Sequence, residues 1–221
     1  MESDYSSFQL KDRIAIVTGP SQGIGRAIAL GLAKAGANLV LAEHPAMHQD
    51  ELKQVKAAVE TLGRQAVATL TDISKVDEVR AMVDLAVQTF GRLDILVNNA
   101  GWTCNGPALE TTEEDYDKTV DSTVKGTFFA CQAAARAMIP NGGGRIVNIG
   151  SNFAVSAWRG RAVYCGAKAD VHQLSRRRKR SDPRPRRIVE IADAPTSAAL
   201  RGDRRRFVRG VVRQRGPTSS E

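Results

Sequence analysis

Short apolar runs alternate with amphipathic stretches through the first three quarters of the sequence. The runs occupy residues 13–18, 39–42, 66–70, 93–97 and 146–149. Runs of this length are typical of buried strands, and the stretches between them repeat apolar residues at helical spacing. Such alternation is most simply satisfied by parallel strands joined through crossover helices. We therefore predict an α/β fold, a doubly wound parallel sheet flanked by helices on both faces.

Helix starts and buried helix faces can also be predicted. Ser74 with Asp77 and Thr112 with Asp115 have the spacing of a capping box, which marks the start of a helix. Apolar residues at helical spacing predict the face that each helix turns inward. In the helix at residues 23–35 these are Ile24, Ile28 and Leu32, and in the helix after Thr112 they are Tyr116, Val120, Val124 and Phe128.

A glycine-rich segment follows the first apolar run, with the sequence Thr-Gly-Pro-Ser-Gln-Gly-Ile-Gly over residues 18–25. Its glycines let the turn tighten and let backbone N–H groups and a helix N-terminus approach a pyrophosphate, although they could also serve the turn alone. At the end of the second run, Glu43 could accept hydrogen bonds from both hydroxyls of a ribose and repel a phosphate there. The alternative is that Glu43 is a solvated strand-end residue.

A serine, a tyrosine and a lysine follow the fifth run. Tyr164 and Lys168 are four residues apart, which places them on one face of a helix. Because a nearby cation favours the phenolate, we expect Lys168 to lower the pKa of Tyr164. Ser151 follows the apolar run, whose carboxyl end is where open α/β sheets bind ligands. The alternative is an ordinary amphipathic helix with an exposed lysine.

Together with Asn98-Asn99-Ala100-Gly101, these motifs resemble the short-chain dehydrogenase/reductase family over about residues 10–174. The resemblance implies a Rossmann-like fold and hydride transfer between a nicotinamide cofactor and a secondary alcohol or ketone, of 3-oxoacyl, polyol, sugar or steroid type. It also implies that Tyr164 is the general acid/base, that Lys168 holds the nicotinamide ribose, and that Ser151 hydrogen-bonds the substrate oxygen.

The resemblance implies which residues surround the cofactor. These are Gly19, Ser21, Gln22, Gly23, Ile24, Gly25, Glu43, Asp72, Ile73, Asn99, Ala100, Gly101, Tyr164 and Lys168. Asp72 would contact the adenine amine and Asn99 a ribose, whereas Asn98 is expected to tie neighbouring strands together. Gln22 and His44 stand where NADP-preferring relatives often carry a basic residue. Together with the carboxylate at the end of the second run, they favour NAD over NADP.

Thr123 departs from the family pattern. Family members usually carry an asparagine there, twenty-eight residues before the serine, which supports a water molecule of a proton relay. A hydroxyl can hold a water molecule too, but it offers one donor where an amide offers two. Thr123 is therefore a catalytic candidate, and whether it supports the relay stays open.

Length and composition limit the class of protein. The chain has 221 residues, 42% of them hydrophobic, which suits one domain with a sizeable core. No apolar run approaches the ~18 residues that a bilayer crossing needs, and residues 1–9 lack a signal-peptide pattern, so we expect a cytoplasmic protein without membrane contact. Cys104, Cys131 and Cys165 are widely spaced, which predicts neither a disulfide framework nor a metal site.

The positive charge lies at the end of the chain. Residues 176–221 contain fifteen Lys and Arg against five Asp and Glu, so this segment carries +10 and the first 175 residues carry −2 of the net charge of +8. The segment departs from the family pattern except at residues 187–192, which could form the next strand. Three explanations compete: a shifted reading frame, a divergent and largely disordered tail, and a nucleic-acid arm. The last is disfavoured because the basic run at residues 176–187 contains no aromatic residue and belongs to no recognised nucleic-acid-binding fold.

We therefore divide the chain into an N-terminal tail (1–10), a nucleotide-binding domain with the catalytic residues (11–175) and a basic segment (176–221) in which the family fold is incomplete. Two classes of function follow. The first is an NAD(P)-dependent oxidoreductase for a small alcohol or ketone, which the resemblance implies is a homodimer or homotetramer. The second is a non-catalytic or weakly active nucleotide-binding or interaction protein, because the family's substrate loop falls in the segment that is off pattern.

Overall fold

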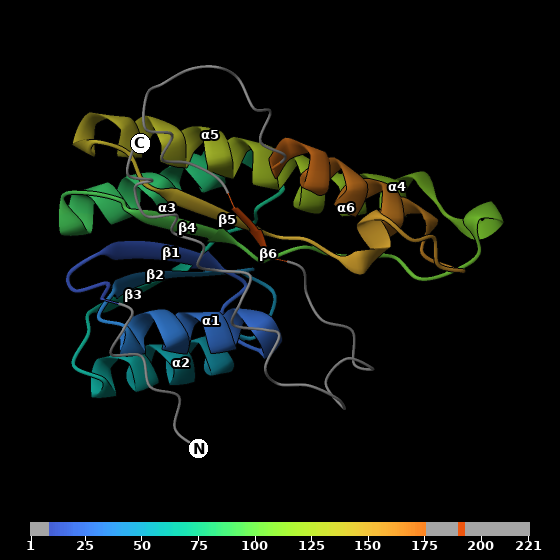
Figure 1. Ribbon diagram of the computed structural model, residues 1–221. Coiled ribbons are helices and arrows are strands. Elements are labelled where there is room, and N and C mark those ends of the chain that lie inside the picture. Colours follow the sequence, from blue (N-terminus) through green and yellow to red (C-terminus); the bar gives the residue numbers. More distant parts are fainter. Residues whose placement is uncertain (1–8, 176–189, 193–221) are drawn as a thin grey trace, which may run out of the picture.

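The computed structural model describes residues 9–175 and 190–192, and their strands form one parallel sheet (Figure 1). In the order β3-β2-β1-β4-β5-β6, the strands are β3 (Ala66–Leu70), β2 (Asn38–Glu43), β1 (Ile14–Thr18), β4 (Ile95–Asn98), β5 (Arg145–Ile149) and β6 (Glu190–Ala192). The chain winds outward from β1 in one direction and then from β4 in the other. Ligands of doubly wound sheets bind at this reversal, beyond the carboxyl ends of β1 and β4.

Helices cover both faces of the sheet, as predicted (Figure 1). One face carries α1 (Gly23–Lys34) and α2 (Gln49–Thr61), and the other carries α3 (Val76–Phe90) and α5 (Gly126–Met138). On the side of α5, α4 (Glu113–Val120) and α6 (Ala162–Ser175) contact each other. Every described helix is too short or too polar to span a membrane.

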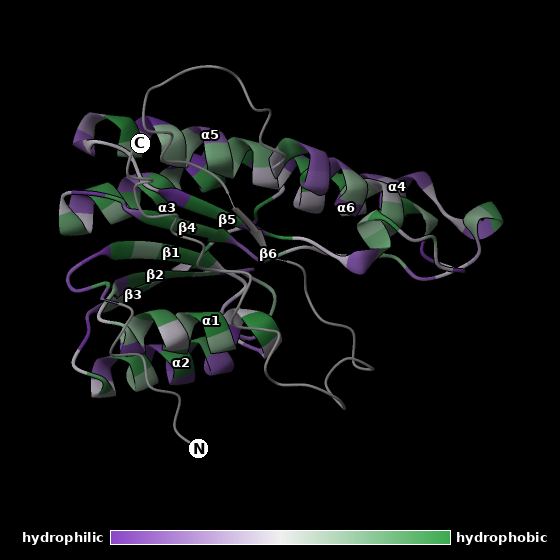
Figure 2. Cartoon of the chain, in the orientation of Figure 1, coloured by the Kyte–Doolittle hydropathy of each residue, from purple (hydrophilic) through white to green (hydrophobic). Residues whose placement is uncertain are grey.

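The core consists of two apolar layers separated by the sheet. Ile16 and Leu96 face α3 and α5, whereas Val17 and Leu41 face α1 and α2. Because both faces are covered, the central strands are apolar along their whole length, while the helices are apolar mainly toward the sheet (Figure 2). This pattern explains why the strands could be recognised in the sequence as continuous apolar runs.

One predicted helix face is only partly right and another is wrong. In α1, Ile28 and Leu32 pack against the core, but Ile24 is 41% exposed. The fully buried residues of α1 are Gly25, Ala29 and Ala33, since its close approach to β1 leaves room only for small side chains there. The predicted face after Thr112 is turned outward, with Tyr116 51% and Phe128 45% exposed.

The outward face of α4 and α5 has a local cause. A π-helical turn, η2 (Asp121–Lys125), joins α4 to α5. The wider turn shifts the helical phase, so a stripe drawn at ideal α-helical spacing through this segment does not mark the buried side. Thr119, Thr123, Thr127, Ala130 and Ala134 are the buried residues instead.

One predicted cap is confirmed and one is wrong. Thr112 Oγ1 accepts a hydrogen bond of 3.1 Å from the backbone N–H of Asp115, as the first residue of a capping box should. Ser74, in contrast, does not cap α3, which begins at Val76. Its hydroxyl donates to Asp72 Oδ1 at 2.7 Å, which turns the side chain toward the loop before α3.

Buried amides tie β4, β5 and α6 together. Asn98 Nδ2 donates to Asn148 Oδ1 at 2.8 Å, which confirms that Asn98 links neighbouring strands. Asn148 Nδ2 in turn donates to Ser175 Oγ at 2.8 Å, in the last turn of α6. Asn148 therefore fixes the far end of α6 to the middle of the sheet.

The described part of the chain resumes at β6, inside the predicted strand at residues 187–192. It pairs in parallel with β5, Asn148 lying opposite Ile191. The predictions for the first eight residues, for 176–189 and for 193–221, including disorder of the basic segment, lie outside the described residues.

We expect the substitution Asn148→Ala to lower the free energy of unfolding by about 2–3 kcal/mol, because it removes two buried hydrogen bonds and leaves polar partners without them. Urea denaturation followed by circular dichroism measures this change. Asn141→Ala is the matched control, since that amide bonds to Ala137 O in an exposed position, and its effect should stay within about 0.5 kcal/mol. Equal effects of the two substitutions would contradict the role given to Asn148.

Candidate active site

Hydrogen bonds made by Thr18 and Asn99 connect the carboxyl ends of β1 and β4. Thr18 Oγ1 accepts hydrogen bonds of 3.0 Å from the backbone N–H groups of Asn99 and Ala100. Asn99 Nδ2 donates to Thr18 O at 3.0 Å and to Gly19 O at 2.9 Å. The amide nitrogen of Asn99 is therefore committed to the chain, so a ribose could be bound only through the side-chain oxygen.

The glycine turn is packed against this contact. Gly19 has a φ of +62°, and a Cβ there would lie 3.1 Å from Asn99 Nδ2. A Cβ on Gly25 would overlap the carbonyl oxygen of Gly19. Only glycine fits these two positions, and their packing lets the main chain and the N-terminus of α1 form the floor of a ligand site.

Ser21 is buried in the same turn, and its Oγ has no hydrogen-bond partner among the described residues. A buried hydroxyl without a partner costs free energy, which a ligand acceptor at this place would recover. A turn with close-packed glycines and a free hydroxyl fits the pyrophosphate of a dinucleotide.

Glu43, at the end of β2, is 6% exposed, so the alternative of a solvated strand-end residue is wrong. Its Oε2 accepts a hydrogen bond from the backbone N–H of Ser21 at 3.3 Å, and its Oε1 accepts one from that of His44 at 2.9 Å. The carboxylate therefore holds the glycine turn and lies beside any ribose bound there.

A cavity of about 930 Å³ opens above these elements. Ten of the predicted cofactor residues line it, namely Gly19, Gln22, Ile24, Gly25, Glu43, Asp72, Ile73, Asn99, Ala100 and Gly101. Of the described residues that were predicted, Ser21, Gly23, Thr123, Ser151, Tyr164 and Lys168 are not in this lining. The structure thus brings the predicted nucleotide residues together and places the predicted catalytic residues outside this cavity.

The lining also contains residues that sequence reasoning did not assign to the site: His44, Ala46, Met47, His48, Ser74, Trp102, Glu114, Asp117, Lys118, Asp121 and Ser122. Trp102 could have been found, because it directly follows the Asn-Asn-Ala-Gly motif. The sequence pattern did not indicate a binding role for the acidic residues of α4, since charged residues at this spacing are typical of the solvated face of a helix.

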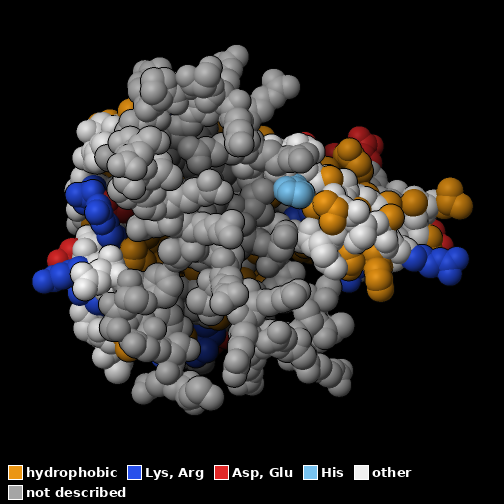
Figure 3. Space-filling model, in the orientation of Figure 1, with side chains coloured by type: hydrophobic (Ala, Val, Ile, Leu, Met, Phe, Trp, Pro, Cys, Tyr) orange, Lys and Arg blue, Asp and Glu red, His pale blue; other side chains and the backbone are white. Residues whose placement is uncertain are grey.

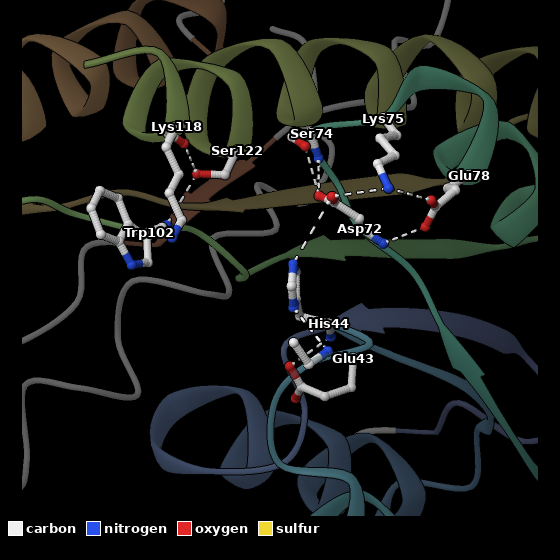
Figure 4. Close-up of polar contacts among 10 residues, drawn as sticks. Glu43, His44, Asp72, Ser74, Lys75, Glu78, Trp102, Lys118 and Ser122 are labelled. Atoms are coloured by element: carbon white, nitrogen blue, oxygen red, sulfur yellow. Dashed lines mark hydrogen bonds and ion pairs between the residues drawn. The ribbon is translucent and has the colours of Figure 1, made fainter. Parts of the chain in front are cut away.

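Asp72 stands on the wall opposite Glu43 (Figure 4). Burial alone would raise the pKa of its carboxyl, but the hydrogen bonds from Ser74 and the nearby charges of His44 and Lys75 hold it below the usual value. His44 Nε2 lies 4.0 Å and Lys75 Nζ 3.7 Å from Asp72 Oδ2. An ionised acceptor is thereby available where an adenine amine was expected.

Three hydroxyls of α4 and η2 hold the loop after β4. Ser122 Oγ accepts a hydrogen bond from Trp102 N at 3.2 Å, and Thr119 Oγ1 accepts one from Cys104 N at 3.4 Å. Thr123 Oγ1, 1% exposed, donates to Trp102 O at 3.4 Å. Lys118 Nζ lies 4.4 Å from the centre of the Trp102 ring, which completes this wall (Figure 4).

The predicted catalytic residues lie beyond the carboxyl end of β5. Lys168 is 6% exposed and its Nζ donates to Ile149 O at 2.7 Å, so the alternative of an exposed lysine is wrong. Nζ lies 5.8 Å from the centre of the Tyr164 ring. The Ser151 hydroxyl is close enough to Tyr164 to lower the pKa of its phenol. The serine, the phenol and the ammonium therefore share one site.

The expected effect of Lys168 on Tyr164 is not found. Burial raises the pKa of the Tyr164 phenol, and the nearby Ser151 hydroxyl and the charge of Arg161 only partly oppose this. Burial also lowers the pKa of Lys168 to about 8. The reason is geometric, since the ammonium is turned to the carbonyl of Ile149 and is itself desolvated.

In the described part of the chain, no three His, Cys, Asp or Glu side chains gather in a way that could hold a metal ion. The three cysteines there are free.

The chain is similar to known proteins. A family model described as short chain dehydrogenase matches residues 13–205. The chain is 37% identical over 172 residues to 2-dehydro-3-deoxy-D-gluconate 5-dehydrogenase of Escherichia coli K12, a match that covers 77% of this chain and 66% of that protein. It is 40% identical over 179 residues to the hydroxynaphthalene reductase-like protein Arp2 of Metarhizium anisopliae, with 79% and 64% covered. The chain thus spans slightly less than two thirds of the length of these relatives.

Solved structures agree with this comparison. A short chain dehydrogenase from Burkholderia cenocepacia J2315, in complex with NADP, superposes with a TM-score of 0.71 at 38% identity, covering 76% of this chain and 67% of that one. A short-chain type dehydrogenase/reductase from Mycobacterium marinum gives a TM-score of 0.71 at 33% identity, with 78% and 70% covered.

The lowered pKa of Lys168 predicts how stability depends on pH. The folded protein releases this proton at about pH 8, whereas the unfolded chain keeps it up to about 10.5. The penalty of burying the ammonium is therefore complete below pH 8 and is relieved between pH 8 and 10.5, by on the order of 3 kcal/mol. Urea denaturation at several pH values, compared with Lys168→Met, should show the wild type gaining stability relative to the variant over this window. Parallel curves would contradict the assignment.

Proposed function

Because the chain belongs to the short-chain dehydrogenase family, we propose that it is an NAD(P)-dependent oxidoreductase that transfers a hydride between a nicotinamide and a secondary alcohol or ketone. The observation that carries the proposal is that Ser151, Tyr164 and Lys168 share one site beside a cavity whose glycine turn fits a pyrophosphate. The bound nicotinamide would supply or accept the hydride.

Residues of the chain would bind the substrate oxygen and transfer its proton. Ser151 Oγ and Tyr164 Oη, which lie close enough for the serine to lower the pKa of the phenol, would both donate to a carbonyl oxygen. The raised pKa keeps Tyr164 protonated at neutral pH, as a proton donor in the direction of reduction must be. Lys168, with its pKa near 8, is mostly charged at neutral pH and would hold a ribose hydroxyl while it is fixed by Ile149 O.

Thr123 is less suited to a proton relay than the family's asparagine. Its hydroxyl has one hydrogen to donate, and it donates that hydrogen to Trp102 O. We assign Thr123 to positioning the loop after β4. The relay would then have to pass through other groups.

The non-catalytic alternative gains no support from these relatives, which are named as a dehydrogenase and a reductase-like protein. We propose a cytoplasmic location and assembly as a homodimer or homotetramer. Tyr116 and Phe128, exposed on α4 and α5, would supply apolar surface to such an interface.

We propose NAD as the preferred cofactor. The buried carboxylate of Glu43 lines the cavity and would repel a 2′-phosphate on a ribose bound beside it, and Gln22 offers no positive charge to compensate. The NADP in the Burkholderia structure belongs to that relative and does not decide the preference of this chain.

Calorimetric titration should show NADH binding at least about tenfold more tightly than NADPH, which corresponds to about 1.4 kcal/mol. Gln22→Arg should narrow this gap, because it adds a cation to the cavity lining. Gln49→Arg is the control, since Gln49 is exposed on α2 and absent from the lining, and it should leave the ratio unchanged. Tighter binding of NADPH by the wild type would refute the assignment.

Tyr164→Phe should reduce turnover by at least about 100-fold, because it removes the proton donor. Affinity for NADH should stay within about threefold, since the phenol is not part of the nucleotide cavity. Tyr116→Phe, at an exposed tyrosine of α4, is the matched control and should keep full activity. A panel of ketones and alcohols followed by absorbance of the reduced nicotinamide measures turnover, and unchanged activity of Tyr164→Phe would exclude this mechanism.

A further inference from the structure

We propose that the substrate of this site is an aryl ketone, or the corresponding secondary alcohol, whose ring packs against Phe153 and Trp158. The inference rests on the proposed function and names the substrate class for it. It starts from three aromatic side chains in contact. The Phe153 ring meets the Tyr164 ring edge-on, with centroids 6.2 Å apart and an interplanar angle of 80°. The Trp158 ring lies 5.6 Å from Phe153 at 35°.

The row of rings leads from the reacting phenol to the surface. Tyr164 and Phe153 are partly buried, and Trp158 is 63% exposed. Exposed apolar side chains gather at this end of the molecule, near α4 and the loops after β4 and β5 (Figure 3). A carbonyl group held by Ser151 and Tyr164 would therefore leave an attached ring beside two aromatic side chains.

Main-chain and side-chain hydrogen bonds hold the aromatic segment in place. Phe153 N donates to Ser151 Oγ at 3.2 Å, so the serine that would bind the substrate oxygen also fixes the position of the first ring. Arg161 N donates to Trp158 O at 3.2 Å, and Gly106 N donates to Gly160 O at 3.1 Å, which ties this loop to the one after β4. Such a segment would lose little conformational freedom when a ligand binds.

The polar groups of the segment fit an aromatic substrate better than a polyol. Between Ser151 and Tyr164 the sequence contains no acidic residue, and only the side chains of Asn152 and Ser156 can accept a hydrogen bond from a hydroxyl, since those of Trp158, Arg159 and Arg161 only donate. Ser156 Oγ already donates to Asn152 O at 2.9 Å. A polyhydroxylated substrate would leave many hydroxyls unpaired here. The charge of Arg161 is close enough to act on Tyr164, and a planar guanidinium can stack on the face of an aromatic ring.

The reaction balances with the groups already named. In reduction, the carbonyl carbon accepts the hydride as the C=O double bond becomes a single bond, and the oxygen accepts a proton from Tyr164 Oη. The ketone is reduced to a secondary alcohol and the dihydronicotinamide is oxidised. In the reverse direction the phenolate takes the hydroxyl proton.

The test compares 1-tetralone with cyclohexanone, which present the same cyclic ketone with and without a fused aromatic ring, and adds an open-chain polyhydroxylated keto acid. We expect kcat/KM to be at least about tenfold higher for 1-tetralone than for either of the others. Trp158→Ala and Phe153→Leu should each lower kcat/KM for 1-tetralone about tenfold more than for cyclohexanone. Leu109→Ala, at a fully exposed leucine outside the row of rings, is the control and should leave the ratio unchanged.

A binding measurement separates this inference from the proposed function. Saturation-transfer NMR should detect 1-tetralone on the wild-type protein loaded with NADH, and lose it with Trp158→Ala. Binding of NADH without binding of 1-tetralone would overturn the substrate class and leave the cofactor assignment standing. Preference for the keto acid, or equal losses for both cyclic ketones in Trp158→Ala, would overturn it too. Failure to bind NADH would remove the proposed function and this inference with it.

Discussion

The reciprocal contact between Thr18 and Asn99 is the constraint on which the nucleotide site depends. Each residue binds the main chain of the other's strand end, so β1 and β4 leave the sheet at a fixed separation. The glycine turn is then built against the amide of Asn99, and Gly25 brings the start of α1 against the carbonyl of Gly19. Glu43 closes the third side through Ser21. The cavity is thus shaped mainly by backbone held in place by side chains, which suits recognition of a phosphate chain.

The catalytic side chains depend on a second arrangement, in which α6 is anchored to β5 at two consecutive residues. Lys168 binds the carbonyl of Ile149, and Ser175 binds the side chain of Asn148. These bonds lie two helical turns apart, so they fix the rotation of α6 as well as its distance from the sheet. The ammonium is drawn away from the phenol as a result, and desolvation becomes the largest influence on the pKa values of both Tyr164 and Lys168.

Features that depend on the composition of a whole segment, such as strand bounds, can be predicted well from the sequence. Features that depend on the orientation of a single side chain are predicted poorly. The bounds of β1 agree with the predicted run to within one residue because this strand is buried along its whole length and is apolar up to its last residue. The fully buried residues of α1 were missed because glycine and alanine give no hydrophobic stripe. The pKa of Tyr164 could not be predicted from its spacing to Lys168, since the outcome depends on the carbonyl of Ile149, which no side-chain pattern reveals.

In the π-helical turn η2, the number of residues decides which side of the following helix is buried, and this effect is separate from the identity of the side chains. Thr119, Thr123 and Thr127 are all buried although four-residue steps drift by about 40° per turn in a regular α-helix. The wider turn absorbs this drift, so that hydroxyls face the loop after β4 and alanines further along face the sheet. Loss of one residue would rotate everything that follows by about 100°. Over the course of evolution, this segment should therefore accept amino-acid substitutions more readily than insertions or deletions.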